Sequence, residues 1–330
     1  MDFTELIDLA SERLGGAVLF ANDEFFAPKE NLLKPAAPIF IEGKYTDLGK
    51  WMDGWESRRR RTPGFDWCII RLGLPGIIRG VVVDTSHFKG NYPEACSMEA
   101  CTLNGLPGTE ELTAESMAWT EILARANLSG DSLNPFAITG DSRWTHLRFK
   151  IYPDGGVARL RVFGEVVPDW NRLKRLGGEI DLAAVENGGM VISCSDMFFG
   201  PRHNLIMPGT AANMSDGWET KRRRGPGHDW TIIKLGTPGY LRRLEVDTSY
   251  FKGNFPESCS VESCNATGLP PETVQDPEFV WKPVLARVKL QAHTRHLFDE
   301  VMDVGSASHV RFNIFPDGGV SRLRVFGIIE

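Results

Sequence analysis

Residues 53–101 read DGWESRRRRTPGFDWCIIRLGLPGIIRGVVVDTSHFKGNYPEACSMEAC, and residues 216–264 read DGWETKRRRGPGHDWTIIKLGTPGYLRRLEVDTSYFKGNFPESCSVESC. Most positions of the two stretches are identical, and the register is kept without a gap. In each copy a segment beginning at Gly15 or Gly188 precedes this block, and a segment beginning at His146 or His309 and ending in PDGGVxRLRVFG follows it. A repeat unit of this length is a whole domain and not a solenoid repeat. The chain is therefore a tandem duplication.

The last segment of each copy has the periodicity of a β-strand. Leu147, Phe149 and Ile151 alternate with polar residues, and the second copy alternates in the same way. A period of two is typical of a half-buried strand. The sequence Pro-Asp-Gly-Gly that follows predicts a tight turn, which would place Arg148 opposite Arg161 on the next strand. Many short strands separated by Gly, Pro and Asp turns indicate an antiparallel sandwich or jelly roll.

We therefore predict an all-β chain of two tandem antiparallel jelly-roll β-sandwiches. The first repeat is expected over residues 1–168, and the linker with the second repeat over residues 169–330. Apolar residues between positions 3 and 14 predict a short N-terminal helix that ends at Gly15, and the linker is expected to be partly helical. The segment of residues 36–52 has more residues than the corresponding segment before Asp216 in the second copy. Such an insertion often shapes a site or an oligomer contact, although loop drift is an equal alternative.

Composition and charge exclude several classes of partner. The chain has 37 basic and 43 acidic residues and a net charge of −6, which argues against nucleic-acid binding. No apolar run approaches the roughly 20 residues that span a bilayer, and the N-terminus lacks the pattern of a signal peptide. We expect a cytoplasmic protein with no membrane partner, whose six cysteines are free thiols. The open faces of a duplicated sandwich favour a homo-oligomer.

A resemblance to a known family covers nearly the whole chain. The motif DGWxxxRRRxPGxDWxIIxLGxPG, continued by VDTSxFKGNxPExC and closed by PDGGVxRLRVFG, occurs twice and resembles the allantoicase family. More distantly, each repeat resembles the discoidin or galactose-binding β-sandwich. The first resemblance implies two jelly-roll repeats and an amidine-type hydrolase that converts allantoate to ureidoglycolate and urea, a late step of purine (allantoin) degradation.

This reaction sets requirements that the residues must meet. Allantoate carries a carboxylate and two ureido arms on one carbon, and one C–N bond of this aminal breaks. The site must hold the carboxylate, for which arginine has suitable bidentate geometry. It must also protonate the departing nitrogen and deliver water, which requires an acid and a base of matched pKa. The chain has no HExxH or HxH pattern, so we predict neither a metal site nor a cofactor, while a divalent metal requirement stays open.

Two groups of residues are candidates for these tasks. The predicted substrate-binding residues are cations of the two basic runs and the aspartates that follow them: Arg59, Arg60, Arg61, Asp66, Arg222, Arg223, Arg224 and Asp229. The alternative is a solvated loop whose cations pair with nearby carboxylates. The predicted catalytic residues lie in the FKGNxPE loops: His87, Lys89, Glu94, Lys252 and Glu257. For Asp84, Thr85 and Asn91 in the first loop, a turn-forming role is the expected one.

Differences between the copies bear on which of them is active. His87 is replaced by Tyr250, so the two loops cannot have the same acid–base groups. The first copy has both His87 and the insertion, and we favour it as the active one; the alternative is that both loops act on one substrate. His146 and His309 are expected on outward faces. Two other functions stay open, namely a non-catalytic tandem module that binds carbohydrate or another small ligand, and a degenerate paralogue kept for assembly.

Overall fold

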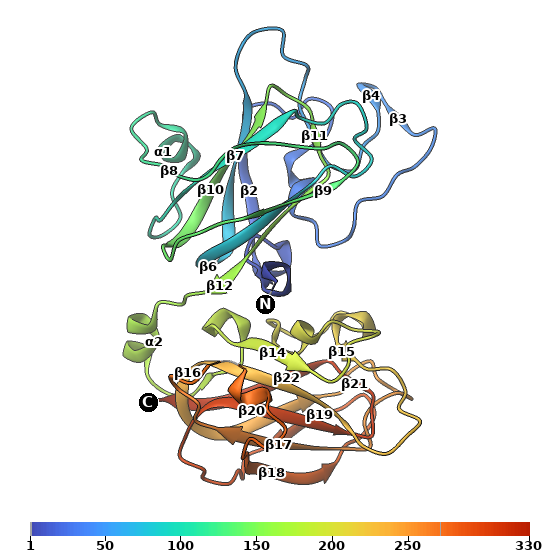
Figure 1. Cartoon of the computed structure of the whole chain (residues 1–330), viewed down its shortest axis with the longest axis vertical. Helices are drawn as coiled ribbons and strands as arrows, with labels where there is room; N and C mark the ends of the chain where they lie inside the picture. Colours follow the sequence, from blue (N-terminus) through green and yellow to red (C-terminus); the bar gives the residue numbers. More distant parts are fainter. Residues whose placement is uncertain (1, 271) are drawn as a thin grey trace. The chain divides into compact units, whose positions relative to one another are not determined.

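The computed structural model describes residues 2–270 and 272–330 of the chain. It divides into two compact units, Met1–Val167 and Pro168–Glu330. Each unit is built almost entirely of antiparallel strands, as Figure 1 shows. The predicted all-β architecture of two antiparallel sandwiches is confirmed.

The first unit contains one short α-helix, α1 (Thr109–Thr113), and twelve strands among the described residues. The strands are β1 (Ile7–Asp8), β2 (Ala17–Ala21), β3 (Tyr45–Thr46), β4 (Gly49–Lys50), β5 (Trp55–Glu56), β6 (Asp66–Asp84), β7 (Ala95–Cys101), β8 (Thr120–Asn127), β9 (Leu133–Ala137), β10 (Arg143–Tyr152), β11 (Gly156–Val157) and β12 (Arg159–Val166). Short 3₁₀ helices lie at Phe3–Glu5, Glu12–Leu14 and Lys29–Leu33.

The second unit repeats this order without a counterpart of the β3–β4 hairpin. It begins with α2 (Trp170–Leu176), which confirms the predicted helical part of the linker. Its strands are β13 (Ile180–Asp181), β14 (Met190–Cys194), β15 (Trp218–Glu219), β16 (Asp229–Asp247), β17 (Ser258–Cys264), β18 (Lys282–Lys289), β19 (Arg295–Phe298), β20 (Ser306–Phe315), β21 (Gly319–Val320) and β22 (Arg322–Ile329). Its 3₁₀ helices are Val185–Asn187, Arg202–Ile206, Met214–Asp216 and Thr273–Gln275.

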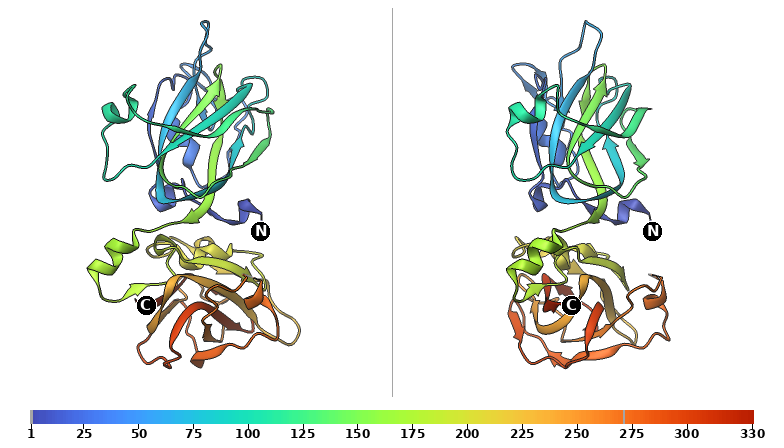
Figure 2. Two further views of the ribbon diagram at one scale, coloured as in Figure 1. Left: turned by 60° about the vertical axis from the view of Figure 1, so that its left-hand side comes forward. Right: turned by 90° about the vertical axis from the view of Figure 1, so that its left-hand side faces the viewer.

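One long strand organises each unit. β6 has 19 residues; its first half pairs with β10 and β2, and its second half pairs with β12 and β9. In the second unit, β16 pairs in the same way with β20, β14, β22 and β19. The long strand therefore joins two sets of neighbouring strands in each unit. Figure 2 shows the strands of each unit in two further views.

Alternating side chains of these strands fill the core. Leu147, Phe149 and Ile151 on β10 are fully buried, as the period of two predicts. Trp55 on β5 is also fully buried, packs at 6.3 Å from Phe149, and donates its indole N–H to the Asp23 carbonyl. This packing fixes the short strand β5 against the sandwich.

Three predictions about local structure were wrong. Residues 3–14 form two 3₁₀ helices flanking the short strand β1, which pairs with β12, and not one helix. The Asp8 carboxylate, at the end of β1, accepts hydrogen bonds from the backbone N–H groups of Ala10 and Val162. His146 and His309 are buried and not outward-facing.

The third wrong prediction is the pairing of β10 with β12. Both strands pair with β6 instead, so Arg148 and Arg161 do not face each other across a hairpin. Arg148 forms an ion pair with Glu99 at 2.5 Å, and Arg161 lies 3.5 Å from Asp8. The periodicity of the sequence identified which face of each strand is buried, but it did not identify the strand with which each one pairs.

The insertion at residues 36–52, here called the strap, loops out from the first unit and carries the β3–β4 hairpin (Figure 1). It is held by the Arg159 guanidinium, which donates to the Ala36 carbonyl, and by Asp53, whose carboxylate accepts the Ile39 N–H. Among the described residues, no helix has the length and apolar character needed to cross a membrane.

Candidate active site

A cavity of about 440 Å³ in the first unit brings several chemically active side chains together. Its walls come from β5, from the loop that follows β6, and from the strap. The lining residues are Phe26, Phe40, Lys50, Met52, Glu56, His87, Lys89, Gly90 and Asn91. Strap residues therefore form a substantial part of the wall.

Glu56 is the buried carboxyl of this cavity. The strand β5 pairs with β11 and bridges to Ala27, and this pairing leaves the Glu56 side chain only 9% exposed. Oε1 accepts a hydrogen bond of 2.7 Å from Asn91 Nδ2. Burial raises the pKa of Glu56 above its ordinary value, and the hydrogen bond from Asn91 opposes this in part. A carboxyl that keeps its proton closer to neutral pH is suited to general acid catalysis.

The loop after β6 supplies the histidine. Asp84 and Thr85 hold the turn by side-chain hydrogen bonds, which confirms their predicted turn-forming role. His87 follows with φ of +72°, a conformation that few residues with a side chain adopt, and its N–H donates to Asp131 Oδ1 at 2.7 Å. For Asn91 the turn interpretation is incomplete, because its side chain also binds Glu56.

The strap positions the imidazole of His87. The Phe40 ring stacks on it with centroids 5.8 Å apart and planes 30° apart. His87 Nε2 lies 3.3 Å from the Pro38 carbonyl oxygen. Since both partners belong to the strap, the orientation of this ring depends on a segment that the second unit lacks.

Two ammonium groups give the cavity a positive character. Lys50 Nζ lies 4.6 Å from the centroid of the Phe40 ring and makes no ion pair with any carboxylate in the part of the chain that the structure describes. The side chain of Lys89 is 80% exposed and has only a long contact of 3.8 Å with Asp131. Both groups can bind an anion.

The second unit has a related hollow of about 610 Å³. It keeps Phe199, Glu219, Gly253 and Asn254, the counterparts of Phe26, Glu56, Gly90 and Asn91. Asn254 again donates to the glutamate carboxylate. The remaining lining differs: Arg222, Arg223, Glu257, Lys289 and Asp317 are present, no strap covers the hollow, and Tyr250 stands where His87 stands in the first unit.

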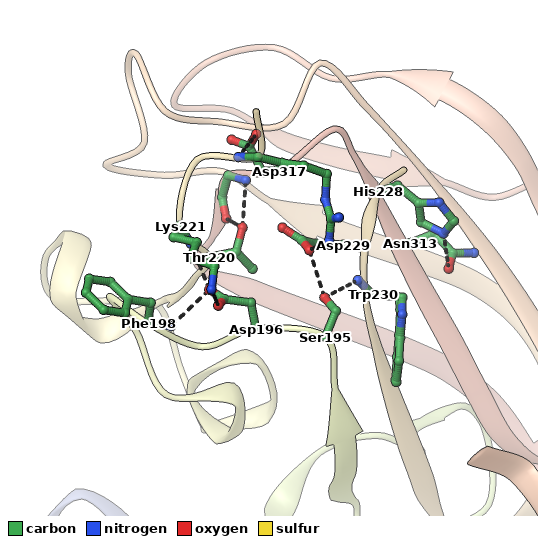
Figure 3. Close-up of polar contacts among 12 residues, drawn as sticks. Ser195, Asp196, Phe198, Thr220, Lys221, His228, Asp229, Trp230, Asn313 and Asp317 are labelled. Carbon is green, nitrogen blue, oxygen red and sulfur yellow. Dashed lines mark hydrogen bonds and ion pairs between the residues drawn. The ribbon is translucent and has the colours of Figure 1, made fainter. Parts of the chain in front are cut away.

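Each basic run forms an ion pair with the aspartate that follows it. Arg60 binds Asp66 at 2.6 Å, and Arg223 binds Asp229 at 2.5 Å, as expected from the alternative in which cations of these runs pair with nearby carboxylates. Both aspartates are 1% exposed. Asp229 also accepts a hydrogen bond from Ser195 Oγ, which in turn accepts the Trp230 N–H (Figure 3).

The predicted site residues are therefore distributed over several places. His87 and Lys89 line the first cavity, whereas Glu94 is exposed and does not line it. Arg59, Arg60 and Arg61 do not line it either. In the second unit, Glu257, Arg222 and Arg223 line the larger hollow, and Lys252 does not. A third hollow of about 380 Å³ is lined by several residues that include Arg222, Arg223, Arg224 and Asp229.

Sequence reasoning missed Glu56, Phe26, Phe40 and Lys50 as site residues. A signal existed for Glu56, because a glutamate follows DGW in both copies. Because Glu56 precedes four arginines in the sequence, it could be interpreted as their counter-ion. In the structure its side chain lines the cavity, which these arginines do not. For Lys50 and Phe40 the only signal was the insertion itself.

The remaining ionisable clusters are few. Within the described residues, no group of three or more His, Cys, Asp or Glu side chains is arranged to hold a metal ion. All six cysteines are free, and burial raises the pKa of Cys96 and Cys259 to about 12, so these thiols are unreactive at neutral pH.

Comparison with known proteins identifies the family. The model of the allantoicase repeat matches residues 7–167 and again residues 180–330. The chain belongs to the allantoicase family. It is 48% identical to a probable allantoicase of Ralstonia nicotianae, over 100% of this chain and 97% of the relative. It is 49% identical to the allantoicase of Dictyostelium discoideum, over 98% of this chain and 87% of the relative.

A solved allantoicase structure has the same architecture. The crystal structure of the allantoicase of Saccharomyces cerevisiae superposes with a TM-score of 0.81 at 37% identity, covering 97% of this chain and 92% of that one. The family predicted from the doubled motif is confirmed, and the two tandem jelly rolls are those of an allantoicase.

Proposed function

We propose that this chain hydrolyses allantoate to ureidoglycolate and urea and that the reaction takes place in the cavity of the first unit. Membership of the allantoicase family supports the reaction. The observation that carries the location is Glu56, a buried carboxyl with a raised pKa that faces a cavity also lined by a histidine and two lysines.

The carboxylate of allantoate is bound by the ammonium groups of Lys50 and Lys89. Arginines were expected in this role, but those of the first basic run do not line the cavity. Lys50 is the stronger candidate of the two lysines, because it has no carboxylate partner among the described residues and is held beside Phe40. A charge-assisted contact of this kind contributes about 1.5–3 kcal/mol.

Glu56 supplies the proton for the leaving group. With Oε1 accepting from Asn91, Oε2 is left to carry the proton. As the bond between the central carbon and one ureido nitrogen breaks, the electron pair goes to that nitrogen and Glu56 protonates it, so that urea departs. Bond breaking leaves the central carbon electron-poor. The lone pair of the remaining ureido nitrogen stabilises this carbon.

Water completes the reaction on the same carbon. Its oxygen forms the new C–O bond while His87, held by Phe40 and by the backbone contact to Asp131, accepts its proton. The product carries one hydroxyl and one ureido group beside the carboxylate, as ureidoglycolate does. Proton return from His87 to Glu56 through solvent restores the site.

We also propose a cytoplasmic location and a homo-oligomer. Six free cysteines are compatible with a reducing compartment. The strap exposes the large apolar side chains of Ile39, Tyr45 and Leu48, and a second copy of the chain would remove such side chains from water. Sedimentation analysis of the purified chain tests the assembly.

The reaction itself is tested by product analysis. Freshly purified chain incubated with allantoate is expected to release urea and ureidoglycolate in equal amounts. Absence of urea, both with and without added manganese or zinc, would contradict the proposal. Binding of allantoate in that case would favour the non-catalytic module.

A further inference from the structure

We propose that the hollow of the second unit binds a second small ureido carboxylate and does not hydrolyse it. The inference rests on the proposed function, because it takes the ligand class from that reaction. It concerns a separate cavity, and its test does not depend on turnover.

The hydrogen-bonded Glu–Asn pair that we propose contacts a ureido group, here called the binding corner, is present in both units. Glu219 and Asn254 are joined by the same side-chain hydrogen bond as Glu56 and Asn91. In each pair the amide N–H₂ is donated to the carboxylate, which leaves the other carboxylate oxygen and the amide oxygen as acceptors. A ureido group offers several N–H donors to such acceptors. Phe199 adds an exposed ring face on which a planar ureido group can stack.

The groups that complete the chemistry in the first unit are missing from the second. No strap covers this hollow, so neither a Phe40 nor a Lys50 counterpart is present. Tyr250 replaces His87 and has the same left-handed backbone, but its N–H is held by His293 Nδ1 where the first unit uses Asp131. A neutral tyrosine hydroxyl is a poor base for accepting a proton from water.

In the second unit, Arg222 is the cation that would bind the carboxylate of the ligand, in place of the lysines of the first unit. Arg222 lines the hollow, is exposed, and has no carboxylate partner in the described part of the chain. Its neighbour Arg223 is already engaged by Asp229. The planar guanidinium of Arg222 can bind a carboxylate by two parallel hydrogen bonds, which an ammonium group cannot do.

The hollow is thus lined by groups of both charges, which include Glu219 and Arg222. The Glu219 carboxylate attracts N–H donors, and the Arg222 guanidinium attracts a carboxylate. A molecule that carries both a ureido group and a carboxylate offers a partner to each of these groups. Both the substrate and the product of the proposed reaction belong to this class, so the second unit binds the kind of ligand that the first unit turns over.

Equilibrium dialysis with radiolabelled ureidoacetate tests the proposal. This probe has one ureido group and one carboxylate but lacks the second ureido arm, so the reaction cannot release urea from it in the proposed way. Wild type is expected to bind two equivalents per chain. Arg222→Gln is expected to weaken the second equivalent at least about tenfold, the loss of one charge-assisted contact.

Arg224→Gln is the matched control. It removes a neighbouring cation of the same run that lines the third hollow and not this one, so two equivalents should remain. No bound equivalent in the wild type, or binding that Arg222→Gln leaves unchanged, would overturn the proposal. Urea release from allantoate, measured on the same preparation, shows separately whether the proposed function stands.

Discussion

Asn91 Nδ2 donates a hydrogen bond of 2.7 Å to Oε1 of Glu56, and this contact joins the loop after the long strand β6 to the short strand β5. The amide binds one carboxylate oxygen of a side chain that lines the cavity. Its counterpart joins Asn254 to Glu219. The duplication has therefore kept the binding corner in both units, while the strap and His87 belong to the first alone.

Lys50→Gln tests whether the strap holds the substrate carboxylate. The variant loses the cation that lacks a carboxylate partner in the described structure, so we expect KM for allantoate to rise about tenfold or more with a smaller change in kcat. Steady-state urea release measures both constants.

Lys44→Gln is the control for Lys50. Lys44 lies on the same strap, but its ammonium sits 3.8 Å above the ring of Trp51 and does not line the cavity. Its KM should equal that of the wild type. Equal changes in the two variants would mean that the strap acts through its fold and not through the charge of Lys50.

Glu56→Gln should make the folded protein more stable at neutral pH. Burial raises the pKa of Glu56, so the native state binds its proton more tightly than the unfolded state does. This contribution to stability is fully present below the ordinary carboxyl pKa of 4.5 and is lost as the pH rises through the folded pKa. Glutamine has no such loss. Differential scanning calorimetry should show a higher Tm for the variant at pH 7 and a smaller difference at pH 4; a lower Tm at pH 7 would contradict the argument.

Asp66→Ala separates a structural from a substrate-binding role for this aspartate. The change leaves the partly exposed Arg60 and the Asn22 side chain without their acceptor, and removal of one partner from a buried pair costs up to about 3 kcal/mol when the other partner is part-solvated. We expect a lower Tm and an unchanged KM in the protein that remains folded. A raised KM at unchanged Tm would support the predicted substrate-binding role.

Much of the fold could be predicted because a pattern that recurs in both copies is more informative than a pattern in one copy alone. The alternation at Leu147, Phe149 and Ile151 recurs in the second copy, and the structure buries all three side chains. Strand neighbours could not be predicted in this way, since β10 and β12 lie close in sequence yet both pair with β6. The N-terminal segment misled because its apolar residues fit a helix, whereas β1 pairs with β12 and its Asp8 caps the turn.

The site was harder to predict than the fold, for physical reasons. Glu56 is identical in both copies, but identity between copies does not distinguish a buried acid from a counter-ion of the adjacent arginines. Its burial follows from the pairing of β5 with β11, a contact between residues far apart in sequence. Lys50 and Phe40 have no counterpart for comparison. His87 and Lys89 were predicted from the chemistry of their loop, and their roles stay proposals.

The most direct test of the account is urea release by Glu56→Gln beside Glu219→Gln. Both changes remove one carboxyl from the same Asn–Glu pair, one in each unit, and circular dichroism verifies that both variants are folded. We predict a loss of at least about a hundredfold in kcat for Glu56→Gln, typical of removing a general acid, and less than about a threefold change for Glu219→Gln. Full activity of Glu56→Gln, or its loss in Glu219→Gln alone, would contradict a catalytic site in the first unit.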